Sequence, residues 1–187
     1  MTIYYTEDFA GGHKESRALL EQSIAAYTGD GRQAHELVSA VRGGEMGKPY
    51  IEGFRHFSVS HTGKNWAVLI SGHECGLDIQ QGRKCDAVAI AVRIFAPEDA
   101  DRVAALNEKG AGKACDEFFR LWCRREALVK ATGGSVADTG YPSVMPDRVI
   151  IDGNEYCIKD ISIPDLSGLY AAVCTLGEPE ATDYRHL

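Results

Sequence analysis

Trp122-Cys123-Arg124-Arg125-Glu126-Ala127-Leu128-Val129-Lys130 is the middle of the strongest helix signal in this chain. Apolar residues recur there at helical spacing, and the spacing predicts a helix from about Asp116 to Thr132. Acidic residues in its first turn suit the positive end of the helix dipole. Gly133-Gly134 follows the last periodic position, and glycine readily takes the left-handed conformation that ends a helix.

Three side chains of this helix are spaced for a chemical role. Trp122, Glu126 and Lys130 are four residues apart, so they share one side of the helix. A carboxylate beside a large aromatic ring, at the edge of the buried stripe, is a typical position for a working acid. A Glu–Lys ion pair on a solvated face, worth about 0.3–0.5 kcal/mol, explains the same spacing and is common.

Composition sets the class of protein. The chain has 187 residues, 44% of them hydrophobic and 25% charged, which is typical of one large or two small globular domains. The net charge of −7 argues against a nucleic-acid binder, which needs a positive surface. No apolar run is long enough to span a membrane, and no export signal is visible. The six cysteines lack metal-finger spacing, so we expect reduced thiols in a cytoplasmic protein.

The rest of the chain alternates between helix and strand signals. We predict helices near 13–27, 33–42, 87–93 and 97–110, and strands at 2–6, 56–60, 65–71, 75–79, 148–152, 155–159, 161–163 and 169–175. Residues 177–187 are polar, and we expect a loose tail there.

A weak internal echo suggests that the chain consists of two similar halves. Phe57-Ser58-Val59 precedes one apolar strand by nine residues, and Ile161-Ser162-Ile163 precedes another by the same distance. Short hairpins also resemble each other by default, so the echo leaves duplication open. We predict an α+β fold with pseudo-twofold halves at 1–85 and 86–176, each a small antiparallel sheet packed with a long helix.

Asp78 interrupts the apolar strand Gly76-Leu77-Asp78-Ile79-Gln80. Side chains alternate along a strand, so Asp78 and Gln80 face one side while Leu77 and Ile79 face the other. A carboxylate inside a strand needs a cation, a set of hydrogen bonds or a metal ion. An aspartate that caps the turn after a strand end explains the local pattern equally well.

A third motif is Phe57-Ser58-Val59-Ser60-His61-Thr62-Gly63. Ser60, His61 and Thr62 are expected at a hairpin tip, where amides, hydroxyls and an imidazole can converge on an anion. A solvated loop is the simpler alternative. No Gly-x-Ser-x-Gly elbow is present, which argues against a hydrolase triad.

Together the three motifs resemble the Sfp-type 4′-phosphopantetheinyl transferases. That family carries a Phe-x-x-Ser-His-Ser/Thr turn, a Gly-x-Asp-x-Glu strand and a Trp-x-x-Lys-Glu-Ala-x-x-Lys helix in the same order. The turn Gly47-Lys48-Pro49 is also typical of the family, and the helix that follows His13 looks like its N-terminal helix. The resemblance spans roughly residues 13–135.

The resemblance implies the 4′-phosphopantetheinyl transferase fold and a Mg²⁺-dependent reaction. The phosphopantetheine arm of coenzyme A would move onto a serine of an apo acyl or peptidyl carrier protein, releasing 3′,5′-ADP. The implied catalytic residues are Glu126, Lys130 and Asp78, the implied metal ligands Asp78, Glu126 and Gln80, and the implied coenzyme A contacts Lys48, Pro49, Ser60, His61 and Arg17. Glu126 could also take the proton of the acceptor serine. We expect a monomer, because duplication supplies within one chain the paired interface of shorter relatives.

Some residues depart from the family pattern. Gln80 replaces the usual second acid, Arg125 replaces a lysine, and Gly133-Gly134-Ser135 lacks a lysine that often follows the helix. Gln80 therefore leaves a second hypothesis open, a catalytically weak relative that binds coenzyme A or a carrier protein. Arg120 and Arg124 could form a face that docks an acidic carrier protein. A solvated basic face with Glu117 as partner is equally consistent.

Overall fold

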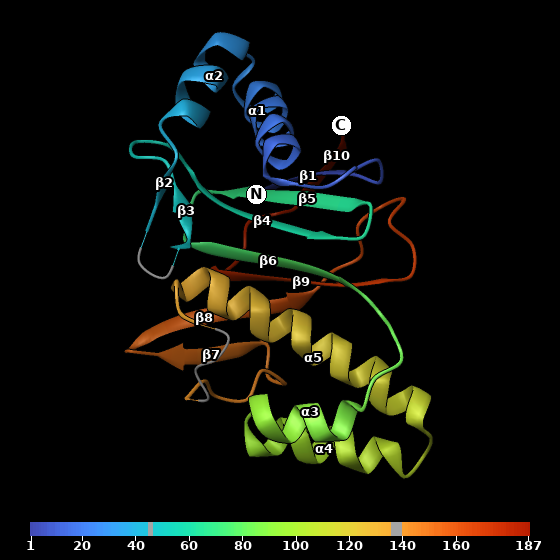
Figure 1. The fold of residues 1–187 in the computed structure, drawn as a ribbon. Coiled ribbons are helices and arrows are strands. Elements are labelled where there is room, and N and C mark those ends of the chain that lie inside the picture. Colours follow the sequence, from blue (N-terminus) through green and yellow to red (C-terminus); the bar gives the residue numbers. More distant parts are fainter. Residues whose placement is uncertain (45–46, 136–139) are drawn as a thin grey trace.

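Two four-stranded sheets lie side by side in the computed structural model, which describes residues 1–44, 47–135 and 140–187 (Figure 1). The first sheet has the order β10-β1-β5-β4 and the second the order β6-β9-β8-β7. The strands are β1 (Thr2–Thr6), β4 (His56–Thr62), β5 (Asn65–Ser71), β6 (Cys75–Gln81), β7 (Arg148–Ile151), β8 (Asn154–Asp160), β9 (Leu169–Leu176) and β10 (Asp183–His186). β2 (Arg42–Gly43) and β3 (Pro49–Tyr50) pair with each other in a two-stranded antiparallel ribbon.

Helices cover the outer faces of both sheets. Figure 1 shows α1 and α2 above the first sheet, and α5 against the second with α3 and α4 beyond it. Their bounds are α1 (His13–Thr28), α2 (Gly31–Ser39), α3 (Ala87–Ile94), α4 (Pro97–Asn107) and α5 (Ala111–Thr132). Separate apolar clusters fill the space under α1 and α2, the space between the sheets, and the space under α5. The expected α+β class is confirmed.

The packing of α5 on β6 depends on one glycine. A Cβ atom at Gly76 would lie inside the van der Waals contact distance of the carbonyl oxygen of Ala127 and close to the backbone nitrogen of Ala131. The helix backbone therefore rests directly on the strand at this point. Because side chains alternate along β6, Asp78 and Gln80 share the face that Gly76 turns toward α5.

The two sheets share a connection pattern. In the first, β1 is followed by helices and then by the hairpin β4–β5, and β1 pairs with β5. In the second, β6 is followed by helices and later by β8 and β9, and β6 pairs with β9. β6 pairs with β9 and is therefore the first strand of the second sheet, although it precedes the predicted boundary after residue 85.

Other corrections concern long-range pairing. The expected loose tail contains β10, which pairs in parallel with β1, so the first sheet is not purely antiparallel. The amino group of Met1 also contacts Glu180 at 2.9 Å. The predicted strand at 161–163 is wrong: only the amide of Ile161 bonds to β9, and Pro164 then supplies no donor.

Helix bounds shifted where capping residues decide them. The side chain of Asp30 accepts hydrogen bonds from the amides of Arg32 and Gln33, so α2 begins at Gly31 rather than near 33. It ends at Ser39, since Arg42 and Gly43 pair with β3. Among the helices of the described ranges, none is both long and apolar enough to cross a bilayer.

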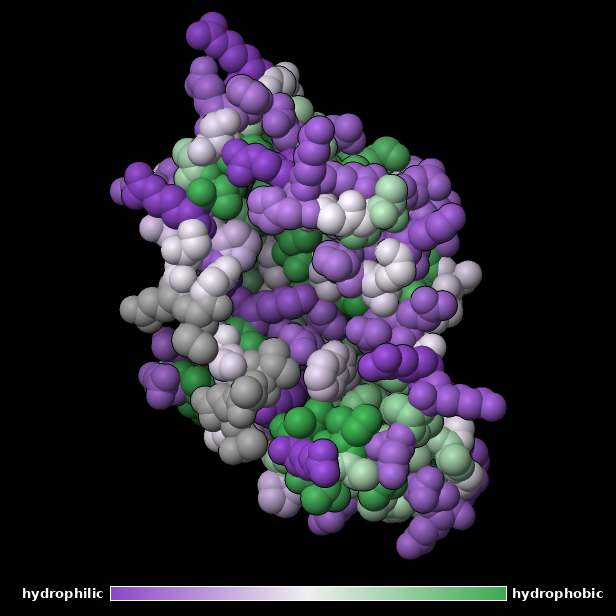
Figure 2. All heavy atoms as spheres, in the orientation of Figure 1, coloured by the Kyte–Doolittle hydropathy of each residue, from purple (hydrophilic) through white to green (hydrophobic). Residues whose placement is uncertain are grey.

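Hydrophobic side chains gather at one end of the molecular surface. Figure 2 shows them over α3 and α4, whereas the band where the two halves meet is mainly hydrophilic. Val92 of α3 is one of the exposed apolar residues.

Candidate active site

Asp78 is the centre of a buried polar cluster between β4, β6 and α5. Lys130 Nζ donates to Asp78 Oδ1 at 2.7 Å, to the carbonyl oxygen of Leu77 at 3.0 Å and to Ser60 Oγ at 3.1 Å. Ser60 Oγ in turn donates to Asp78 Oδ1 at 2.8 Å. An ammonium group has three protons, so these three acceptors use its full donor capacity. Lys130 of α5 therefore forms its ion pair with Asp78 of β6. A solvated Glu126–Lys130 pair thus does not explain the spacing of these two residues on the helix.

The other carboxylate oxygen of Asp78 has a different environment. Within the described residues, Asp78 Oδ2 is buried and has no hydrogen-bond partner. Leaving a buried acceptor unpaired is costly, so such an atom requires an explanation, and a bound cation would be one. One carboxylate oxygen of Asp78 therefore accepts hydrogen bonds from protein donors, and the other accepts none within the described residues.

Glu126 approaches the same place from α5. Burial raises the pKa of its carboxyl group, and the negative charge of Asp78 raises it further, while Lys130 and Arg125 oppose the shift. Two acids far apart in sequence are therefore close enough for the charge of Asp78 to disfavour ionisation of Glu126. A raised carboxyl pKa produced by burial and by a like charge is typical of functional sites.

This donor set fits a hard divalent cation. Mg²⁺ prefers oxygen ligands and is commonly bound by one or two carboxylates together with substrate phosphates and water. Asp78 Oδ2 and the Glu126 carboxylate provide such a pair. No group of three or more His, Cys, Asp or Glu side chains placed to hold a metal ion occurs in the part of the chain that the structure describes. The remaining ligands would therefore come from substrate, water or an amide.

A cavity of about 300 Å³ opens beside Glu126. Lys130 and Glu126 form one wall, Lys48 and Pro49 another, and β4 and the glycines after α5 complete it. Lys48 Nζ donates to the carbonyl oxygen of Ala131 at 2.9 Å, at the C-terminal end of α5. Burial lowers the pKa of Lys48. The cavity is thus lined by the lysine side chains of Lys48 and Lys130 and by the carboxyl group of Glu126.

Comparison with known proteins agrees with this geometry. The profile of the 4′-phosphopantetheinyl transferase superfamily matches residues 74–154, a range that includes Asp78, Glu126 and Lys130. The chain is thus similar to this superfamily over less than half of its length.

Named relatives support this similarity. The chain is 29% identical over 126 residues to the 4′-phosphopantetheinyl transferase of Bacillus subtilis, covering 60% of this chain and 53% of the relative. It is 32% identical over 137 residues to the 4′-phosphopantetheinyl transferase AcpT of Salmonella typhi, covering 71% and 65%. A third relative, the 4′-phosphopantetheinyl transferase gsp of Aneurinibacillus migulanus, is 32% identical over 92 residues, covering 49% and 37%. The matches thus span from about a third to two thirds of the relatives' lengths, and the resemblance seen in the motifs is confirmed.

The three family motifs occupy three different elements that converge. The Ser-His motif lies on β4, the Gly-x-Asp motif on β6 and the Glu-Ala-x-x-Lys motif on α5. The structure brings Ser60, Asp78, Glu126 and Lys130 of these motifs together. Their sequence spacing alone could not show that Lys130 would take Asp78 as its partner.

Other expected site residues lie further out. Arg17 is exposed on α1. His61 is exposed, and its ring lies 5.1 Å from that of Phe9. Gln80 lines a separate small hollow with Trp122, and its Nε2 donates to the carbonyl oxygen of Gln81 at 3.2 Å. Among the described residues, no hydrogen bond or ion pair joins these three to the Asp78 cluster, and their site roles stay predictions.

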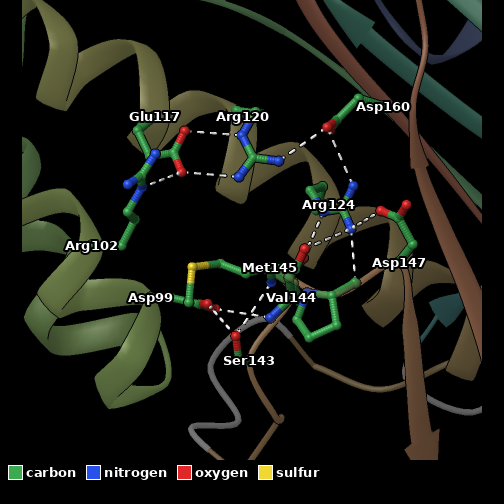
Figure 3. Close-up of polar contacts among 11 residues, drawn as sticks. Asp99, Arg102, Glu117, Arg120, Arg124, Ser143, Val144, Met145, Asp147 and Asp160 are labelled. Carbon is green, nitrogen blue, oxygen red and sulfur yellow. Dashed lines mark hydrogen bonds and ion pairs between the residues drawn. The ribbon is translucent and has the colours of Figure 1, made fainter. Parts of the chain in front are cut away.

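Arg120 and Arg124 do not form the exposed docking face that we considered. Arg124 is only 1% exposed, and its guanidinium donates to the carbonyl oxygens of Val144 and Pro146 at 2.6 and 2.8 Å and pairs with Asp147 (Figure 3). Arg120 pairs with Glu117, the alternative partner, and with Asp160. The arginines hold the segment after α5 and the end of β8 against the helix.

Two hydroxyl residues near the site have a structural role that the sequence did not predict. Ser58 Oγ accepts a hydrogen bond from the amide of Leu77 at 3.0 Å, and Thr62 Oγ1 accepts one from Gln81 at 3.2 Å. Ser60 Oγ accepts from Ile79 at 3.2 Å between them. The signal was present as hydroxyl side chains at every second position of one strand, since such positions share a face.

Proposed function

We propose that this chain transfers the 4′-phosphopantetheine arm of coenzyme A to a serine of an apo acyl or peptidyl carrier protein. The reaction would need Mg²⁺ and release 3′,5′-ADP. The supporting observation is the approach of two acids from distant elements, Asp78 on a sheet and Glu126 on a helix, in a chain similar to phosphopantetheinyl transferases. Asp78 Oδ2 is buried and accepts no hydrogen bond from the described residues, so it is available as a metal ligand.

The proposed metal site uses Asp78 Oδ2 and Glu126. A bound Mg²⁺ would neutralise the pyrophosphate charge and orient it for in-line attack. Gln80 shares the α5-facing side of β6 and remains a candidate third ligand, which an amide oxygen could provide after its side chain turns.

Proton transfer falls to Glu126 in this proposal. Its raised pKa brings the carboxylate closer to the range in which it can accept a proton from the acceptor serine, directly or through one water. The proton of the serine hydroxyl passes to the base as the oxygen attacks the phosphorus of the phosphopantetheine phosphate, and the bond to the departing nucleotide phosphate breaks.

Lys130 would stabilise charge on the departing phosphate. Its ammonium already contacts Asp78, Leu77 and Ser60, so one of these hydrogen bonds has to be released for a direct phosphate contact. Lys130 can also act without moving, by holding Asp78 Oδ1 while Oδ2 faces the cation.

Coenzyme A is proposed to lie in the cavity beside Glu126. Lys48 and Pro49 line that cavity, and Lys48 supplies a cation for the nucleotide phosphates. His61 and Arg17 remain candidates for outer phosphate contacts. Ser60, in contrast, uses its hydroxyl inside the protein.

We further propose that the two halves arose by duplication and act as one monomeric, cytoplasmic unit. The matching order of β1-β5-β4 and β6-β9-β8 supports a pseudo-twofold relation within the transferase fold. The alternative function, binding of coenzyme A or a carrier protein with weak turnover, is favoured by one observation. Gln80 lacks charge and its amide is engaged by the backbone.

Mass spectrometry can separate these functions. The protein is mixed with coenzyme A, Mg²⁺ and several apo carrier proteins, and transfer adds one phosphopantetheine to one acceptor. Glu126→Gln should abolish the mass gain, whereas Glu117→Gln on the same helix, where the residue pairs with Arg120, should retain it. Substantial transfer by Glu126→Gln would refute the role of Glu126. Coenzyme A binding without any mass gain would favour the alternative.

A further inference from the structure

Beside the apolar cluster between the two sheets, a row of side-chain hydroxyls on β4 contacts the neighbouring edge strand β6. Ser58, Ser60 and Thr62 occupy alternate positions of this strand, and their oxygens accept hydrogen bonds from backbone amides of β6 at 3.0, 3.2 and 3.2 Å. Each acceptor lies 19 residues before its donor, so the register is constant along the row. We call this row the hydroxyl ladder.

The ladder replaces a missing backbone pairing. β4 is the edge strand of the first sheet and β6 is the edge strand of the second, and the two strands do not join into one sheet. Amides at a buried edge need acceptors, because an unpaired buried donor is costly. The three hydroxyls supply those acceptors and fix how far β6 can slide along β4.

The middle hydroxyl of the ladder has two further bonds. Ser60 Oγ donates to Asp78 Oδ1 at 2.8 Å and accepts from Lys130 Nζ at 3.1 Å. A hydroxyl offers one donor and two acceptor positions, so Ser60 is fully used. Ser60 is also only 5% exposed. It therefore has no hydrogen-bonding capacity left for a substrate phosphate, the role expected from the sequence.

We infer that Ser60 is a positioning residue that turns the Asp78 carboxylate for metal binding. Its donated hydrogen bond and Lys130 hold Oδ1, which leaves Oδ2 as the open oxygen. Its accepted hydrogen bond from Ile79 ties this orientation to the register between the two sheets. The inference rests on the proposed function, since it takes Asp78 as a cation ligand. Groups that orient a metal-binding carboxylate usually matter for affinity almost as much as the ligand itself.

Manganese binding without coenzyme A tests the inference directly. Free Mn²⁺ is titrated against the full chain by electron paramagnetic resonance for wild type, Ser60→Ala, Ser60→Thr and Ser58→Ala. Removing Ser60 should weaken Mn²⁺ binding about tenfold, the lower end of the usual loss for such a partner. Ser60→Thr should restore affinity, because Thr62 shows that a threonine can serve in the ladder.

Ser58→Ala is the matched control. It removes the same kind of ladder bond, to Leu77, and Ser58 has no hydrogen bond to Asp78 among the described contacts. Its affinity for Mn²⁺ should equal that of wild type. An equal loss in both alanine variants would mean that sheet register alone matters, and would overturn the assignment to Ser60. Unchanged binding by Ser60→Ala would overturn it too.

Activity measurements separate this inference from the proposed function. Ser60→Ala should recover transfer at high Mg²⁺ with an unchanged KM for coenzyme A. A raised KM that excess Mg²⁺ does not correct would show that Ser60 contacts coenzyme A, and would overturn the inference while leaving the transferase standing. Wild type that binds Mn²⁺ but transfers nothing refutes the proposed function alone. If Ser60→Ala does not fold, Ser60→Cys, of similar size but a weaker donor, should show a loss in the same direction.

Discussion

Replacing Lys130 by methionine removes the only ion pair that Asp78 has among the described residues. The ammonium contributes three hydrogen bonds at 2.7 to 3.1 Å, and methionine keeps most of the apolar stem. After the change, Asp78 Oδ1 keeps the hydrogen bond from the hydroxyl of Ser60, and Oδ2 gains no new donor. A carboxylate would then remain buried with the hydroxyl of Ser60 and the nearby thiol of Cys123 but without a cation.

The expected cost follows from burial. The side chain of Asp78 is 8% exposed and that of Lys130 is 28% exposed. Breaking a buried ion pair by removing one partner costs about 3–5 kcal/mol, and the partial exposure of Lys130 favours the lower value of about 3 kcal/mol. For a chain of this size each kcal/mol shifts Tm by about 2–4 °C, so Tm should fall by about 6–12 °C.

Urea unfolding at neutral pH without divalent ions measures this cost. Arg32→Met is the control, because Arg32 and Glu36 form a pair on α2 with side chains 90% and 67% exposed. Its loss should cost at most about 0.5 kcal/mol. If Lys130→Met costs no more than the control, the pair with Asp78 is not the buried contact that the site requires.

Three further changes test other contacts. Gly76→Ala should destabilise the fold by about 3 kcal/mol or prevent folding, because the added Cβ meets the backbone of α5. Gly112→Ala has open space around its Cβ and should stabilise α5 by up to about 1 kcal/mol. Thermal unfolding compares the two variants, and equal effects would contradict the close packing of α5 on β6. Arg124→Met should cost about 3 kcal/mol in urea unfolding, because buried carbonyl acceptors lose their donor, and a cost near zero would show that they find water. The pKa of Glu126 is raised, so its contribution to stability is full below the unfolded carboxyl range and declines as pH rises through the folded value. Mg²⁺ binds the ionised form, so its effect on Tm should grow over the same pH window and vanish in Glu126→Gln; a pH-independent effect would place the ion elsewhere.

Local sequence signals predicted the elements that carry the site. The apolar spacing and Gly133 located the end of α5, and strand alternation placed Asp78 on the face that meets it. The start of α5 was missed because Gly110 caps it without a side-chain hydrogen bond, so no capping residue marks Ala111. The end of a helix was therefore predictable where a capping residue marks it, and the face of a strand residue was predictable from the alternation of side chains.

Long-range pairing could not be predicted in the same way. β10 is a polar segment that becomes a strand because it finds β1 at the other end of the chain. Arg124 looked like a surface cation because its acceptors, near residue 145 and at Asp160, lie 20 or more residues away. The partner of Lys130 was likewise set by the fold rather than by Glu126, four residues before it.

We propose above that Asp78 and Glu126 bind one divalent ion between them. A crystal of the chain grown with coenzyme A and Mn²⁺, measured for anomalous scattering, tests it most directly. We expect a single strong peak in direct contact with Asp78 Oδ2 and the Glu126 carboxylate, and with a phosphate oxygen of coenzyme A. Bound coenzyme A with no peak between these two carboxylates, or with the ion held elsewhere, would contradict it.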